Sequence, residues 1–269
     1  MLLHWEIRKI AHPATYAGIL VLWGLGVLIG VYLWHNPSLI YLREFGFPFH
    51  GLYLPAITLY PLAMIGPILA VLVAGESLAG ERARGTLRMT LTRPVTRVRI
   101  YLVKINLVIV YALFIVFSTL GLTAVLGKVL LGGEGFYLPE SWDNLQAGFF
   151  SLSSKEVGIR LALSGLSIVW YILALAAISF FFSSFQKRTL AGPIFTLIFS
   201  ASFSVLESLD VFQSAHPYFI THHSLYWQTF FSRSIDWSAF FFSFWVIGIY
   251  IVISFVLGGI IFCRRDELD

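Results

Sequence analysis

Six apolar runs alternate with shorter polar stretches along the chain, and this alternation predicts the fold. The runs cover residues 14–34, 54–74, 105–126, 158–182, 190–206 and 238–262. A transmembrane helix needs about 17–25 predominantly apolar residues, so each run is long enough to cross a bilayer. The pattern predicts an all-α integral membrane protein that forms one domain of six transmembrane helices, over residues 1–269.

Three segments outside these runs have patterns of their own. Residues 1–13 place Leu3, Ile7 and Ile10 on one helical face, which favours an amphipathic helix on the membrane surface over the first turns of the first span. Residues 207–237 are too irregular in polarity for a span, and we expect them to lie outward, before the last span. Residues 75–104 form a strongly polar stretch between the second and third spans.

Composition and charge agree with a membrane protein. Of the 269 residues, 58% are hydrophobic and 12% are charged, and the mean hydropathy is +0.83, which excludes a single soluble domain of this size. The net charge of +4 does not indicate nucleic acid, because the Lys and Arg residues gather at the ends of apolar runs. The positive-inside rule places both termini and the polar stretch in the cytoplasm, for a multi-pass protein of the cell inner or plasma membrane.

The polar stretch contains its own start and stop signals for helices. Gly85 is expected to end the helix that continues from the second span. Thr86 can cap a short helix that runs to about Leu91, Pro94 ends the helical region, and Thr96 caps the helix that becomes the third span. This compact helix, turn and helix fits a docking surface for a cytoplasmic partner. Its seven basic residues also fit a topology anchor that contacts anionic lipid.

The order of residues in this stretch resembles the cytoplasmic signature of type-2 ABC exporter permeases. The residues that carry the resemblance are Glu81, Arg82, Gly85, Thr86, Leu87, Pro94, Val95, Thr96, Arg97 and Lys104. More loosely, the six-span layout and the closing Phe262, Arg264, Arg265 and Asp266 are similar to that family. Within the family, the stretch looks most like the subgroup that includes the permease of nitrous-oxide-reductase maturation.

The resemblance implies a transmembrane subunit that is not itself an enzyme. The polar stretch would hold a coupling helix, seated in a groove of a separate ABC ATP-binding subunit that carries the ATP and Mg; this chain, which contains no GxxxxGK[ST] phosphate loop, would hold no cofactor. A second permease copy, identical or a paralogue, would complete the dimer, which would export a substrate or act on an extracytoplasmic protein. The residues expected to dock on the ATP-binding subunit are Glu81, Arg82, Arg84, Gly85, Thr86, Leu87, Arg88, Leu91, Pro94 and Arg97.

Candidate residues for a substrate pathway lie near the ends of the second and fifth spans. They are Glu76, Glu207, Ser200 and Ser204. Acids close to the hydrocarbon tend to face the interior of a bundle, although both also fit a solvated or paired position at the head groups. Serines in a span more often serve helix packing. The outward histidines His216, His222 and His223, with Asp210 nearby, show no fixed ligand spacing, so no metal site is assigned.

Other functions stay open at this point. A non-transporting membrane scaffold or assembly protein would use the polar stretch to bind a partner without moving a solute, and a secondary transporter would need no ATPase. A membrane-embedded enzyme is disfavoured, because no HExxH or GxSxG motif lies in or near a span. The aromatic outward segments fit a lipid, a hydrophobic drug, a glycan or an extracytoplasmic protein as the substrate or partner.

Overall fold

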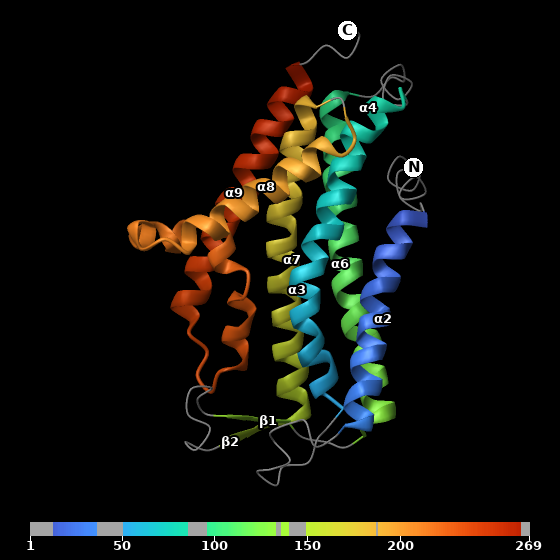
Figure 1. The fold of residues 1–269 in the computed structure, drawn as a ribbon, viewed down its shortest axis with the longest axis vertical. Helices are drawn as coiled ribbons and strands as arrows, with labels where there is room; N and C mark the ends of the chain where they lie inside the picture. Colours follow the sequence, from blue (N-terminus) through green and yellow to red (C-terminus); the bar gives the residue numbers. More distant parts are fainter. Residues whose placement is uncertain are drawn as a thin grey trace.

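Five long apolar helices form an upright bundle in the computed structural model, which describes residues 13–36, 51–85, 96–132, 136–139, 149–186 and 188–264 (Figure 1). The helices are α2 (Pro13–His35), α3 (Tyr53–Gly75), α6 (Arg97–Leu130), α7 (Ser154–Phe185) and α9 (Trp237–Arg264). α3 continues through the π-helical turn η2 (Glu76–Gly80) into the short α4 (Glu81–Ala83). All five are long and apolar enough to cross a membrane, so the chain is a membrane protein by the character of its helices. The predicted surface helix over residues 1–13 falls almost wholly outside the described residues.

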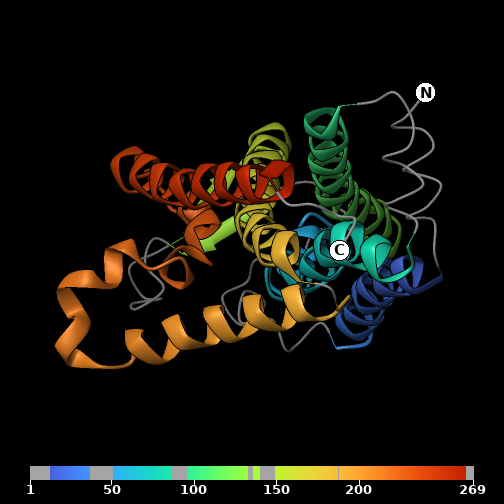
Figure 2. The same ribbon diagram turned by 90° about the horizontal axis from the view of Figure 1, so that it is seen from above.

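The predicted fifth span is not one of these long helices. α8 (Ala191–Glu207) has 17 residues and runs obliquely away from α7 (Figures 1 and 2). Three 3-10 segments follow, η4 (Asp210–Tyr218), η5 (Thr221–His223) and η6 (Tyr226–Phe231), and they lead to the start of α9. The chain after α8 is more polar and contains Pro217, so a longer regular helix does not form. Five of the six predicted transmembrane helices are therefore present as long apolar helices. The chain returns from the end of α7 to the start of α9 through α8 and the three 3-10 segments.

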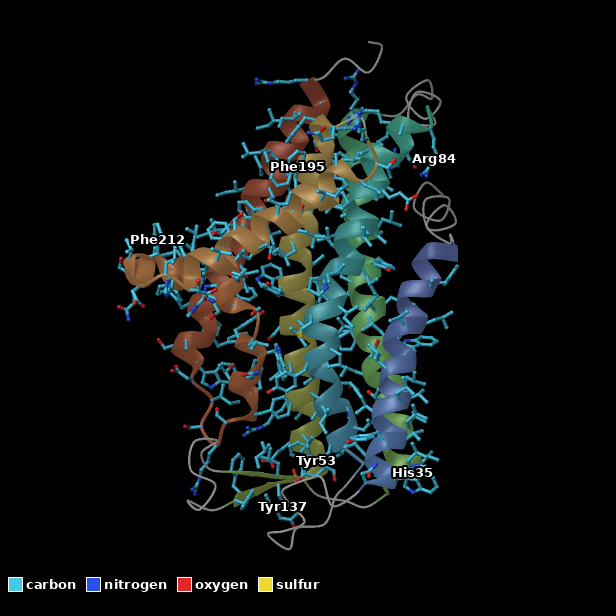
Figure 3. All side chains as sticks on the ribbon, viewed as in Figure 1. His35, Tyr53, Arg84, Tyr137, Phe195 and Phe212 are labelled. Atoms are coloured by element: carbon cyan, nitrogen blue, oxygen red, sulfur yellow. The ribbon has the colours of Figure 1, made fainter. Side chains whose placement is uncertain are left out.

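A two-stranded antiparallel sheet lies at the end of the bundle where α3 begins (Figure 1). β1 (Phe136–Pro139) pairs with β2 (Phe149–Leu152). Tyr53, at the start of α3, holds β1: its hydroxyl oxygen lies 2.8 Å from the carbonyl oxygen and 2.8 Å from the amide nitrogen of Tyr137 (Figure 3). The all-α prediction needs this one correction, because short aromatic runs such as these favour strands.

Side-chain caps decide where two of the helices begin. Thr96 Oγ1 accepts a hydrogen bond from the Arg99 amide at 3.4 Å, which confirms the predicted cap of α6. Ser153 and Glu156 form a capping box at the start of α7. α6 therefore begins at Arg97, directly after its predicted cap, and α7 begins at Ser154, before residue 158, where the apolar run led us to expect it. Apolarity marks the membrane-facing part of a helix and not its first hydrogen-bonded turn.

α7 is the central helix, and α3 and α9 pack against it (Figure 2). Small residues allow the closest approaches at its C-terminal end. A side chain at Gly192 would meet Ser183 of α7, and one at Gly75 of α3 would meet Pro193 of α8. Close backbone approach through small residues is the usual way in which membrane helices pack. α8 therefore starts in firm contact with α3 and α7 before it diverges from them.

Candidate functional site

The polar stretch between α3 and α6 lies at the end of the bundle opposite the sheet (Figures 1 and 3). It is described over residues 75–85 and 96–104. Its first helix ends at Gly85, whose φ of +70° lies in the left-handed region that favours glycine, as the sequence predicted. The other predicted docking residues, Thr86, Leu87, Arg88, Leu91 and Pro94, lie outside the described residues, so the coupling helix itself stays a prediction.

A buried ion pair joins α4 to α6. Lys104 is fully buried and Glu81 is 4% exposed, and Lys104 Nζ lies 2.8 Å from Glu81 Oε2. Nζ also donates a 2.6 Å hydrogen bond to the carbonyl oxygen of Ser77 in the π turn. A π turn interrupts the regular i→i−4 ladder, so a carbonyl there can accept from a side chain. Lys104 is thus held by a charge and by the backbone of the neighbouring element.

Arg82 points towards α7. Its guanidinium group donates hydrogen bonds to the carbonyl oxygens of Ser183, Ser184 and Gln186, at 3.1, 3.3 and 2.7 Å. The last carbonyl groups of a helix have no partner within the helix, and their partial negative charge favours a nearby cation. Arg82 therefore caps the C-terminal end of α7 from a residue of α4.

Two residues of α6 reach α9 in a similar way. Arg97 donates a 3.4 Å hydrogen bond to the carbonyl oxygen of Cys263, close to the C-terminal end of α9. One turn further along α6, the Tyr101 hydroxyl donates to the carbonyl oxygen of Phe255 at 2.7 Å. The sequence did not single out Tyr101, because a tyrosine at the edge of an apolar run carries no signal for its partner.

We call Glu81, Arg82, Arg97 and Lys104 the helix-end cluster. Its contacts join the end of α3 with α6, α7 and α9, because α4 continues α3. Three of its members are cations and one is an acid, so the cluster is positive overall. The sequence brought these residues together only as members of one motif, and the structure shows that they bind different helices.

Three of the described docking residues have contacts within their own chain. Glu81 is buried in its pair with Lys104, and its role in docking stays a prediction. Arg82 and Arg97 direct their guanidinium groups to backbone carbonyls of their own chain. Arg84 lies at the surface, consistent with docking (Figure 3). Glu81, Arg82 and Arg97 therefore contact other helices of the same chain, whereas Arg84 is exposed.

The candidate pathway residues lie at the ends of α3 and α8 and within α8, and each has a contact close by. Glu76 lies at the end of α3 in a 3.0 Å ion pair with Arg84, and its side chain is 39% exposed. Glu207, at the end of α8, accepts hydrogen bonds from Thr221 and His222 of η5. Ser204 donates to the carbonyl oxygen of Ser200 in its own helix. Both acids therefore have partners, which is one of the positions that the sequence left open, and the pathway itself stays a prediction.

The histidines of the 3-10 segments have different partners. His222 Nδ1 lies 2.8 Å from a carboxylate oxygen of Glu207. His223 is buried, and its ring nitrogens lie 3.0 Å from Ser243 Oγ and 2.9 Å from the carbonyl oxygen of Pro217. Burial lowers the pKa of His223, because the charged imidazolium would lose its hydration. No group of three His, Cys, Asp or Glu side chains within the described part of the chain is placed to hold a metal ion.

The sequence was also compared with known families and proteins. Residues 24–268 match the family described as "Protein of unknown function (DUF2705)". The chain belongs to this family. No curated protein matches it. The match includes the helix-end cluster and the five long helices, apart from residues 13–23 of α2.

Proposed function

We propose that this DUF2705 protein is the transmembrane permease subunit of an ATP-driven ABC exporter. A separate ATP-binding subunit docks on residues 75–104, and a second permease copy completes the complex. ATP hydrolysis in the partner then drives export of a substrate or acts on an extracytoplasmic protein. The sequence motif suggests the partner, and the helix-end cluster supplies the physical reason why binding at this loop would move the membrane helices.

The observation that carries the proposal is the connection of one short loop to most of the bundle. A force on α4 reaches α6 through the pair of Glu81 with Lys104, and it reaches α7 through Arg82. A force on the start of α6 reaches α9 through Arg97. Separating the two residues would leave a buried charge without a partner, which costs about 3–5 kcal/mol when one partner is removed, so we expect Glu81 and Lys104 to stay together when α4 moves.

The charged residues in the described part of the loop fall into two groups. The internal members of the cluster hold helices together, while Arg84 and Glu76 form an exposed pair at its edge. An exposed pair is weak and can exchange its partner for one on another protein at little cost. A positive end of the bundle fits an acidic groove on the docking subunit. Both termini and the loop are placed on the cytoplasmic side in this proposal, where ATP is available.

The first experiment is purification of the tagged chain in mild detergent, with mass spectrometry of the proteins that accompany it and an ATPase assay. We expect a stoichiometric subunit that carries a phosphate loop, and vanadate-sensitive hydrolysis. If the chain purifies alone and hydrolyses nothing, the scaffold or secondary-transporter interpretation replaces the proposal.

A substitution pair then tests where the partner docks. Leu87→Asp places a charge on the predicted coupling helix, and Val129→Asp places the same charge on α6 at the other end of the bundle, where Val129 is 75% exposed. We expect Leu87→Asp to abolish stimulated hydrolysis and Val129→Asp to leave it unchanged, with equal amounts of both variants in the membrane. Normal stimulation in Leu87→Asp would show that the loop does not couple the subunits.

A further inference from the structure

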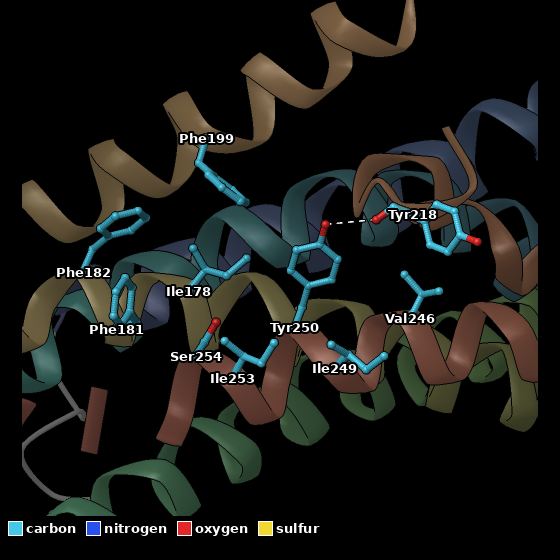
Figure 4. Close-up of a pocket in the computed structure, with 10 residues that line it drawn as sticks. All are labelled: Ile178, Phe181, Phe182, Phe199, Tyr218, Val246, Ile249, Tyr250, Ile253 and Ser254. Carbon is cyan, nitrogen blue, oxygen red and sulfur yellow. Dashed lines mark hydrogen bonds between the residues drawn. The ribbon is translucent and has the colours of Figure 1, made fainter. Parts of the chain in front are cut away.

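A pocket of about 460 Å³ lies between α7, α8 and α9 (Figure 4). Ligand pockets in proteins commonly measure about 300–1,000 Å³, so this one is large enough for a small ligand or one chain of a larger one. In Figure 4, Phe199 of α8 lies on one side of the pocket and a row of α9 side chains lies on the other. Residues that form its walls include Ile178, Phe182, Phe199, Ile249, Ile253 and Ser254.

The chemistry of the walls selects an apolar ligand. Among the described residues that line the pocket none is charged, and the polar side chains are those of Tyr218, Tyr250 and Ser254. The Tyr250 hydroxyl already donates to the carbonyl oxygen of Tyr218 at 3.0 Å, which joins η4 to α9 at one edge of the pocket. Burying a polar or charged ligand group without a partner is costly, so a head group or a sugar does not fit here. A hydrocarbon chain does.

The pocket also lies at the depth where hydrocarbon chains are found. On α9 its walls run from Val246 to Ser254, in a helix that extends from Trp237 to Arg264. At a rise of about 1.5 Å per residue, these walls begin and end roughly 14–15 Å from the two ends of the helix. The hydrocarbon core of a bilayer is about 30 Å thick, so the pocket faces its middle.

The wall residues leave a route from the bilayer. Ile249 and Ile253 are 55% and 52% exposed, and the exposed side chains of α9 between Phe241 and Ile260 are all apolar. A lipid chain beside α9 can therefore enter sideways without crossing water. We propose that the pocket between α7, α8 and α9 binds one hydrocarbon chain of a membrane lipid. This inference rests on the walls and depth of the pocket, and it does not depend on the permease function.

The test is photolabelling with a phosphatidylcholine that carries a diazirine near the end of one acyl chain. The full chain is reconstituted in vesicles, illuminated and digested, and the labelled residues are assigned by mass spectrometry. We expect a label on Ile178, which lines the pocket and is only 4% exposed, in addition to labels on the exposed faces of the helices. A wild-type protein that is labelled on its exposed faces and not on Ile178 would overturn the proposal.

A matched pair of variants separates the pocket from the general lipid contact. Ile249→Trp with Ile253→Trp fills the pocket from α9. Val252→Trp with Val256→Trp makes the same change at two exposed positions of α9 that do not line the pocket, where these valines are 61% and 54% exposed. If each pocket tryptophan displaces the contacts of about two methylene groups, labelling of Ile178 falls by at least tenfold. The control should label Ile178 as the wild type does, and equal labelling in both variants contradicts the proposal.

Protein density distinguishes the lipid from a second copy of the chain. A label on Ile178 that persists from low to high protein-to-lipid ratio supports a lipid occupant. A label that disappears as copies crowd together would show that another copy fills the pocket, and the proposal would then be wrong. If the pocket variant does not fold, labelling of Ile178 in the wild type decides the question without it.

Discussion

Neutralising Lys104 is the most direct perturbation of the helix-end cluster. Lys104→Met keeps most of the aliphatic stem but removes the cation that lies 2.8 Å from Glu81, in a site where both side chains are almost fully buried. Removing one partner of such a pair costs about 3–5 kcal/mol. The carbonyl oxygen of Ser77 also loses its 2.6 Å hydrogen bond, and an unsatisfied buried acceptor costs about 1–3 kcal/mol. We therefore expect a loss of stability of at least about 3 kcal/mol.

A second substitution tests whether the loss comes from the charge. Glu81→Gln combined with Lys104→Met removes both charges, and neutral replacements of a buried pair are often as stable as the pair itself. We expect the double variant to be more stable than Lys104→Met alone, although it differs from the wild type at one more position. Lost packing would not give this result, because Glu81→Gln keeps the shape of the side chain and restores no contact that Lys104→Met removed.

The assay is unfolding of the purified protein in one mild detergent, followed by fluorescence and by retention of the monodisperse peak. Lys128→Met is the control, since Lys128 is an exposed lysine of the same helix, and it should change stability by less than about 0.5 kcal/mol. A loss of less than about 1 kcal/mol in Lys104→Met would place the pair among weak surface contacts and refute the reasoning. A double variant that is less stable than Lys104→Met would refute it as well.

Two further predictions concern packing and the sheet. Gly192→Ala should cost about 1–3 kcal/mol in the same unfolding assay, because the new Cβ would overlap Ser183 Oγ, whereas Gly121→Ala has nothing within 4 Å and should be neutral or slightly stabilising. If Gly192→Ala leaves the stability unchanged, α8 can move away from α7 at no cost and the predicted overlap is refuted. Tyr53→Phe removes the hydroxyl that binds both backbone groups of Tyr137, and it should make the strand segment more sensitive to limited proteolysis while the helices stay protected. Equal cleavage of this variant and the wild type would contradict that role.

The parts of the fold that follow from local geometry were predictable from the sequence. Thr96 caps α6 and Gly85 ends the preceding helix, because a cap and a left-handed turn depend on the residue and its immediate neighbours. The start of α7 follows the same rule, and the pattern of Ser153 with Glu156 was present in the sequence. It was missed because the apolar run begins later than the helix.

The contacts of the cluster could not be predicted, because each joins residues that are distant in sequence. Lys104 gave a signal, since a lysine beside an apolar run is costly to bury and needs a partner, but nothing in the sequence says that the partner is Glu81 rather than another acid. Arg82 gave no signal at all for α7, whose carbonyl oxygens are 101 to 104 residues away. The direction of α8 was hidden for the same reason. Its apolar residues indicate that the helix lies against lipid or protein, but they do not determine the angle between α8 and α7.

α7 connects the helix-end cluster to the pocket between α7, α8 and α9. Arg82 binds the carbonyl oxygen of Ser183, and the residue before it, Phe182, lies in the pocket wall. A displacement of α4 would therefore shift one wall of the pocket by a direct backbone path. We expect Arg82→Gln to change the lipid labelling of Ile178, because the end of α7 loses its cap. Arg84→Gln is the matched control, since Arg84 pairs with Glu76 at the surface and should leave the labelling unchanged. Equal labelling in both variants would show that the cluster and the pocket are mechanically independent.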